Sequence, residues 1–169
     1  MMIETISKEE GLSNRHVHCI IEDQYGFLWI GTDDGLNRYD GNEFIVYKNN
    51  IWDTTSLSSP VINLLAEDQE GNIWVGTPNG LNLYNRHSDS FVRFTHDPEN
   101  EYSISDNDDI EALLIDRNNT NYLWFGTDGG GLNLLDIKMQ KFYNFKYDSM
   151  NTNSISGDKV QALYQDSFG

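Results

Sequence analysis

The sequence predicts an all-β fold assembled from repeated units of four short strands. The first observation is an aromatic segment that occurs three times, at residues 26–32, 71–77 and 121–127, with Trp, one apolar residue, Gly and Thr in the same order. The second is that turn sequences containing glycine separate short β-rich runs. The third is that no segment spaces its apolar residues as a surface helix requires. Strands joined by tight turns are therefore expected along the whole chain.

The first repeat shows the expected order of elements. Strands are predicted at residues 17–22, 27–32, 36–39 and 43–47. The turns between them contain Gly26, Gly35 and Gly41, and an aspartate precedes each glycine within its turn. Such sequences are typical of hairpin turns in which one residue needs a positive φ, a conformation that glycine adopts readily. The last strand alternates apolar and polar residues, which suits an edge strand with one packed face.

The later repeats keep these elements, and together they predict an incomplete β-propeller. Repeats are placed at approximately 11–55, 56–102 and 103–152, with a truncated fourth at 153–169 whose residues 160–165 form an innermost strand. Residues 1–10 are expected to contribute the outer strand of a preceding blade. Units of about 40 to 50 residues are typical of propeller blades, and closed rings use about 4 to 8 of them. The prediction is three four-stranded antiparallel blades plus the first strand of a fourth, as one partial propeller over residues 1–169.

The repeats resemble a known family, the two-component regulator propeller repeat. The matching residues are Gly11-Leu12-Ser13, Asp23, Gly26, Trp29-Ile30-Gly31-Thr32 and residues 35–41, which read Gly-Leu-Asn-Arg-Tyr-Asp-Gly. The resemblance implies the periplasmic sensor region of a bacterial hybrid two-component histidine kinase, similar to regulators of polysaccharide use in gut Bacteroidetes. A cytoplasmic location stays open as the alternative, because the sequence shows no signal peptide. The resemblance also implies an oligosaccharide ligand and a histidine kinase as the parent protein. The sequence itself shows no kinase or receiver motif, so signalling output is not expected from this chain alone.

Charge and hydropathy restrict the classes of partner. The chain has 11 Lys and Arg against 27 Asp and Glu, a formal charge of −16. This charge repels phosphate backbones, so no nucleic acid partner is expected. No segment has the roughly 20 apolar residues that span a bilayer, and residues 1–10 do not read as a signal peptide, so no membrane insertion by this segment is expected. The single cysteine, Cys19, occupies an apolar position and is expected to be a buried, inert thiol.

The tryptophans and aspartates that recur in each repeat have structural interpretations. Trp29, Trp74 and Trp124 are expected in the core between blades, although aromatic rings also suit sugar stacking. The aspartates at the ends of the inner strands, Asp23, Asp68, Asp116 and Asp166, are expected to cap turns rather than to act as catalytic or metal-binding carboxylates. Residues 116–121 lack the glycine and distal glutamate of a calcium loop and are read as a lengthened turn.

Candidate chemistry is sparse. His16 and His18 stand two apart on a strand and could begin a metal site, but the sequence shows no residues that complete it. No catalytic motif or nucleophile–base arrangement is identifiable, so no enzyme activity, no metal and no cofactor are expected.

The candidate ligand-binding residues fall into two sets at one end of the predicted blades. The first set consists of polar residues at one shared position of four inner strands, where the strand meets either an axial channel or a ring of contacts between blades. Its members are His18, Asn63, Glu111 and Gln161. The second set lies in loops on the same face, because loops on a rigid scaffold commonly bind ligands. Its members are Arg15, His16, Asp33, Asp34, Asn79, Asp108, Asp109 and Asp128.

Three functional classes follow, in decreasing order of support. The first is a non-catalytic sensor or ligand-recognition segment of a two-component regulator. The second is a scaffold for protein–protein contact or dimerisation, since a partial ring leaves blade faces bare and self-association is expected. The third is a propeller lyase or hydrolase.

Overall fold

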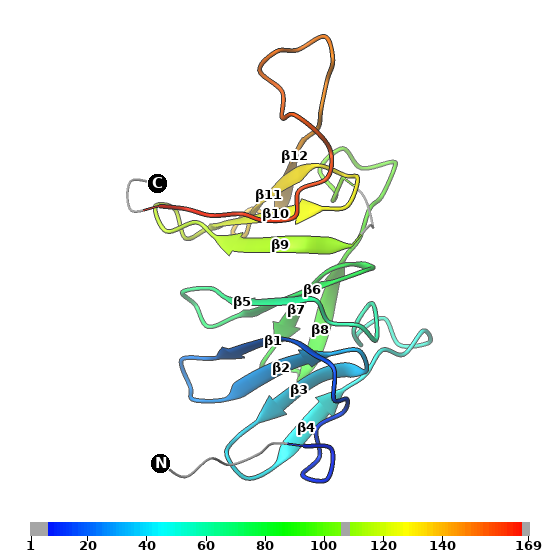
Figure 1. Ribbon diagram of the computed structural model, residues 1–169, viewed down its shortest axis with the longest axis vertical. Coiled ribbons are helices and arrows are strands. Elements are labelled where there is room, and N and C mark those ends of the chain that lie inside the picture. Colours follow the sequence, from blue (N-terminus) through cyan, green and yellow to red (C-terminus); the bar gives the residue numbers. More distant parts are fainter. Residues whose placement is uncertain (1–6, 106–108, 167–169) are drawn as a thin grey trace.

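The structure, a computed structural model, describes residues 7–105 and 109–166. It contains three four-stranded antiparallel sheets stacked on one another, each with its strands in sequence order (Figure 1). The first blade comprises β1 (Val17–Glu22), β2 (Leu28–Thr32), β3 (Gly35–Tyr39) and β4 (Phe44–Tyr47). The second comprises β5 (Leu64–Glu67), β6 (Ile73–Thr77), β7 (Gly80–Asn85) and β8 (Ser90–Phe94), and the third β9 (Ile110–Ile115), β10 (Tyr122–Thr127), β11 (Leu132–Asp136) and β12 (Lys141–Phe145). The predicted all-β blade architecture is confirmed.

The innermost strands β1, β5 and β9 lie next to one another along one side of the stack (Figure 1). Each is followed by a hairpin to the second strand of its own blade. The predicted position of the inner strand of the first repeat, residues 17–22, agrees with β1. Side chains at one position of these strands are therefore brought near one another by the stacking of the blades.

An aspartate–tryptophan pair closes the inner hairpin of each blade. Oδ1 of Asp23 accepts hydrogen bonds from the backbone N–H groups of Tyr25 and Phe27, both at 3.0 Å. Its Oδ2 accepts one from Nε1 of Trp29 at 2.8 Å. The equivalent indole-to-carboxylate bonds join Trp74 to Asp68 at 2.9 Å and Trp124 to Asp116 at 3.1 Å. The predicted turn-capping role is confirmed for Asp23, Asp68 and Asp116, and each carboxylate is engaged by the turn and the tryptophan of its own blade.

The glycine two residues after each tryptophan lets the next blade approach closely. A Cβ on Gly31 would lie 2.7 Å from Cγ2 of Ile62, which belongs to the second repeat. At the same place the N–H of Ile62 donates to the carbonyl oxygen of Thr32 at 2.9 Å. Ile110 and Val160 stand against Gly76 and Gly126 in the same way. The Trp-x-Gly-Thr motif is therefore a docking surface for the following repeat.

Two hydrophobic clusters hold adjacent blades together. The first contains Trp29 and Leu36 of the first blade with Ile73 and Tyr84 of the second, and the ring centroids of Trp29 and Tyr84 are 4.8 Å apart. The second cluster joins Trp74 and Leu81 to buried residues of the third blade. Trp29 and Trp74 are buried as predicted.

Trp124 departs from the prediction of a core residue, because it is only half-buried. Trp29 and Trp74 are each covered by the following blade, whereas no complete blade follows the third one among the described residues. Trp124 has the same position in its repeat as Trp29 and Trp74. Its lower burial therefore comes from the lack of a complete following blade among the described residues.

The predicted innermost strand at residues 160–165 is not formed as a strand. This segment runs in an extended path beside the third blade, joined to it by the bridge between Asp128 and Lys159 and by the bond from the Val160 N–H to the Thr127 carbonyl oxygen at 3.0 Å. A strand requires a hydrogen-bonded neighbour, and no second strand pairs with it within the described part of the chain. The outer strand expected in residues 1–10 falls mainly on residues 1–6, outside the described residues.

Candidate functional site

The candidate residues gather at the end of the blades where the inner strands begin and where the second strand turns into the third. The backbone there is tied across the blades, because the N–H of Gly35 donates to the carbonyl oxygen of Pro60 at 2.7 Å and the N–H of Gly131 donates to that of Asp158 at 2.7 Å. In the first and third blades, the turn between the second and third strands thus contacts the segment that enters the next repeat. Side chains on these segments are held on a rigid frame.

The four polar residues at the shared position of the inner strands line one hollow. His18, Asn63, Glu111 and Gln161 surround a volume of about 310 Å³ together with the apolar side chains of Leu64 and Ile110. Among the described residues no hydrogen bond joins any two of these four. The arrangement is therefore an open hollow with polar walls rather than a closed ring of hydrogen bonds between blades.

The first blade contributes a compact group of His16, His18 and Asp33. Nδ1 of His16 lies 2.7 Å from Oδ2 of Asp33, and Nε2 of His18 lies 2.7 Å from Oδ1 of the same carboxylate. Hydrogen bonds from His18 and then His16 hold the pKa of Asp33 below its usual range. The sequence suggested the two histidines without a third ligand, and the β2–β3 turn supplies one.

At the corresponding place, carboxylates of the third blade form ion pairs with a lysine of the fourth repeat. Nζ of Lys159 lies 2.8 Å from Oδ1 of Asp128 and 3.7 Å from Oε1 of Glu111. The hydrogen bond to Asp128 raises the pKa of Lys159. Lys159 was not among the sequence candidates. It aligns with His16 of the first repeat, and that alignment could have indicated it as a candidate.

The remaining loop candidates lie outside the hollow. Asp34 pairs with Nζ of Lys48 at 2.6 Å, and Arg15 pairs with Glu9 at 3.3 Å on the exposed surface. Nδ2 of Asn79 donates to the carbonyl oxygen of Ser58 at 3.2 Å, which fastens the β6–β7 turn. Asp109 contacts the hollow through Asn63, whose Nδ2 lies 3.4 Å from its Oδ1. Asp108 lies outside the described residues.

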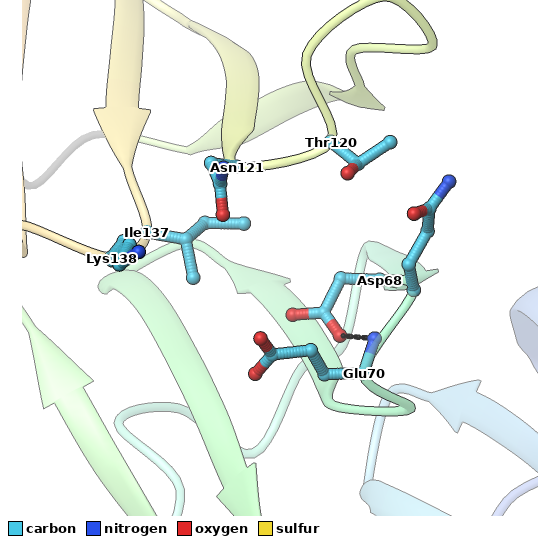
Figure 2. A pocket seen from close by; sticks show the side chains of 7 residues that line it. Asp68, Glu70, Thr120, Asn121, Ile137 and Lys138 are labelled. Atoms are coloured by element: carbon cyan, nitrogen blue, oxygen red, sulfur yellow. Dashed lines mark hydrogen bonds between the residues drawn. The ribbon is translucent and has the colours of Figure 1, made fainter.

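A second hollow of about 290 Å³ opens at the opposite end of the strands, between the second and third blades. Figure 2 shows Asp68 and Glu70 on one side of it and Asn121 with Ile137 on the other. The Asp68 carboxylate is engaged there by the N–H groups of its own turn and by the indole of Trp74. Gln69, Thr120 and Lys138 complete the lining of this hollow.

Cys19 lies half-buried against the first hydrophobic cluster. Burial raises the pKa of its thiol to about 12, which keeps it protonated at neutral pH. This state agrees with the predicted inert thiol.

The comparison with protein families finds a match in the first two repeats. The model described as "Two component regulator propeller" matches residues 11–34 and 56–79. A curated relative, histidine kinase P4 of Formosa agariphila, is 51% identical over 49 residues, which are 29% of this chain and 4% of the kinase.

Solved structures show the same architecture. The extracellular domain of the hybrid two component system BT3049 of B. thetaiotaomicron has a TM-score of 0.82 and 30% identity over 94% of this chain. That of BT4673 from the same organism has a TM-score of 0.74 and 23% identity over 95% of this chain, a likeness in fold. This chain covers 22% and 20% of those two chains, about a fifth of each.

These neighbours are described as extracellular domains. In the part of the chain that the structure describes, no helix is long and apolar enough to cross a membrane. The two matched segments contain the aspartate and tryptophan of the first two indole-to-carboxylate bonds and the glycines Gly31 and Gly76, against which the next repeat packs. Two segments of the chain, residues 11–34 and 56–79, therefore match the two-component regulator propeller repeat, and the blades that contain them resemble extracellular propeller domains of hybrid two-component systems.

Proposed function

We propose that this chain is a non-catalytic ligand-recognition segment of the periplasmic sensor propeller of a two-component regulator, and that the hollow beside His18 takes part of an uncharged oligosaccharide. The observation that carries the proposal is the convergence of one polar residue from each successive inner segment on the same hollow. The family match and the extracellular neighbours support the sensor role.

The chemistry of the hollow suits sugar hydroxyl groups. The amides of Asn63 and Gln161 each offer donors and an acceptor, and the carboxylate of Glu111 accepts, so the wall can meet hydroxyls that both donate and accept. The half-buried side chain of Leu64 adds an apolar wall for a C–H face of a sugar ring. A formal charge of −16 disfavours anionic ligands, which is why a neutral sugar is proposed.

The buried tryptophans do not take part in this proposal. Trp29 and Trp74 are 0% and 1% exposed, so their rings are covered by the adjacent blades and present no face to a sugar. Recognition in the hollow would rest on hydrogen bonds.

The test is a thermal-shift screen of the purified chain against neutral oligosaccharides, followed by calorimetry with any sugar that raises the melting temperature. The variant Asn63→Ala with Gln161→Ala should weaken that sugar by about tenfold or more, because two hydrogen bonds of about 0.5–1.5 kcal/mol each are lost. Asn42→Ala, an exposed asparagine in the β3–β4 turn, is the matched control and should bind as the parent does. A panel without any shift, or a sugar that binds the double variant equally well, would contradict the proposal.

A second candidate function is a scaffold for protein contact or dimerisation. It is favoured by the apolar residues at the two ends of the stack, where Ile20 is 57% and Tyr164 is 86% exposed. Concentration-dependent association without any sugar response would favour it over the first. Release of products from glycans by the purified chain would instead favour a lyase or hydrolase.

A further inference from the structure

The group formed by His16, His18 and Asp33 goes beyond the sugar proposal, because its ligand atoms all belong to one blade, although His18 also lines the hollow. One ligand atom from each residue lies within 4.8 Å of the others. Both imidazole nitrogens already point at different oxygens of one carboxylate, each at 2.7 Å. We infer that these three residues form a binding site for a divalent transition-metal ion of the Zn²⁺ class.

The backbone holds the three side chains together before any ion binds. The N–H of Asp33 donates to the carbonyl oxygen of His16 at 3.4 Å, and Oδ1 of Asn14 accepts from the N–H of His16 at 2.9 Å. The pairing of β1 with β2 shifts register between Val17 and Cys19, so His18 lies within this irregularity. Such an irregularity re-aims side chains, and the two histidine rings lie 4.6 Å apart between centroids, tilted by 52°.

The other repeats show that the fold does not require these residues. The second repeat has Val61, Asn63 and Pro78 at the three corresponding positions. Two of those three side chains have no metal-binding atom, yet the second blade forms the same four-stranded sheet. The imidazoles and the carboxylate of the first blade are therefore additions to the blade rather than parts of its framework.

The third repeat shows how a positive charge is accommodated at this place. It carries Asp109, Glu111 and Asp128, and the ammonium group of Lys159 lies between two of these carboxylates. In the first blade the nearby cations are engaged elsewhere, Lys48 with Asp34 and Arg15 with Glu9. The described contacts place no ammonium or guanidinium group on the Asp33 carboxylate.

The donor set selects the kind of ion. Two imidazoles and one carboxylate suit Zn²⁺ and its neighbours among the first-row metals, whereas Ca²⁺ and Mg²⁺ prefer oxygen ligands alone. Three protein ligands leave a fourth tetrahedral position for water or for another oxygen. Because His18 also lines the hollow, the fourth coordination position lies at the rim of that hollow. The side chain of His16 is 68% exposed, so it is free to rotate the short distance that bonds of about 2.0–2.2 Å require.

The experiment is a calorimetric titration of Zn²⁺ into the tag-free chain after treatment with a chelator. One ion should bind per chain, and Ca²⁺ or Mg²⁺ at the same concentration should give no comparable heat. The test variant is His16→Val with His18→Asn, which installs the residues that the second repeat carries and so keeps the blade foldable. Loss of a residue that only supports a metal ligand typically weakens metal affinity by roughly 10- to 100-fold. This variant removes two ligands, so its affinity for Zn²⁺ should fall by at least that much.

A second variant, Asp33→Asn, should also weaken Zn²⁺ binding, because it removes the anionic ligand while keeping the shape of the side chain. The matched control is His87→Ala, which removes an exposed histidine in the β7–β8 turn and should leave affinity unchanged. Far-ultraviolet circular dichroism verifies that each variant keeps its sheets. Absence of Zn²⁺ binding by the parent chain, equal binding by the His16→Val and His18→Asn variant, or equal loss in the His87→Ala control would overturn the inference. All of these titrations are made without sugar, so their outcomes do not depend on whether a sugar binds the hollow.

Discussion

At the scale of single residues, stability depends on the tryptophans that lie between blades. Trp74 is 1% exposed and bonds to Asp68, whereas Trp52 is 89% exposed in the linker that precedes the second blade. Trp74→Ala is expected to lower the free energy of unfolding by about 3–5 kcal/mol, as deletion of a buried aromatic side chain typically does. Urea denaturation measures the loss. Trp52→Ala is the control and should unfold at nearly the parent midpoint; equal midpoints for both variants would contradict the structure.

The carboxyl group of Asp23 makes stability depend on pH. It is fully buried, and it accepts hydrogen bonds from Trp29, from two backbone N–H groups and from Nη2 of Arg86 in the second blade at 2.7 Å. Burial raises the pKa of Asp23, but the hydrogen bonds from Trp29 and Arg86 outweigh it and hold the pKa below its usual range.

A carboxyl group with a lowered pKa in the folded state stabilises the protein fully above its unfolded-state pKa of about 3.9 and loses that contribution as the pH falls through the folded-state value. The stability difference between the parent chain and Asp23→Asn should therefore be largest near neutral pH and shrink below about pH 4. Urea midpoints of both proteins between neutral and acidic pH measure it. A difference that stays constant into acid would show that the carboxylate charge does not contribute.

At the scale of the strand, the second strand of each blade is shaped by the next blade. Gly31 in β2 has no room for a side chain, because a Cβ would lie 2.7 Å from Cγ2 of Ile62 and would also meet Sγ of Cys19. Gly31→Ala should push the first two blades apart and destabilise the chain by about 1–3 kcal/mol, the usual cost of overpacking.

The control is Gly157→Ala, since a Cβ there meets no atom within 4 Å. Thermal unfolding followed by circular dichroism compares the two variants. If Gly31→Ala melts at the temperature of Gly157→Ala, the close docking of the second repeat onto β2 is not a determinant of stability.

At the scale of the whole molecule, both ends of the stack present apolar surface. At one end Ile20 is 57% exposed; at the other, a hollow of about 500 Å³ is lined by Trp124, Leu114 and Tyr164, among others. Within the stack, the corresponding faces are covered by the adjacent blade. The two ends are different surfaces, so contact between chains would be head to tail.

We expect the isolated chain to associate through these ends. Light scattering at micromolar concentration should give a mass above the 19.4 kDa of one chain. Ile20→Asp should reduce association, and Ile51→Asp, in the exposed linker between the first and second blades, should leave it unchanged. A stable monomer of the parent chain over the whole concentration range would refute this expectation.

Net charge governs the response to nucleic acids. With a formal charge of −16, the chain should not retard DNA or RNA in a gel-shift assay at moderate salt. Retardation that weakens steeply as salt is added would reveal a basic surface that the sequence does not indicate. Binding of a neutral sugar should be almost independent of salt, because no counterions are released.

The sequence by itself determined the features that depend on contacts within a repeat. The bounds of β1, the turns at Gly26 and Gly35, and the pairing of Asp23 with its turn all follow from local turn chemistry and strand pattern. The shared polar position of the inner strands was also readable by alignment of the repeats, since identical blades place equivalent residues alike.

The tertiary structure decided whatever depends on a neighbour. The same motif buries Trp74 and leaves Trp124 half-buried, because only the first of them is covered by a complete following blade. Residues 160–165 have the composition of a strand, but within the described residues no strand pairs with them. Asp33 completes the group with His16 and His18 because the β1–β2 pairing brings the β2–β3 turn beside the start of β1, a proximity that spacing along the chain does not reveal.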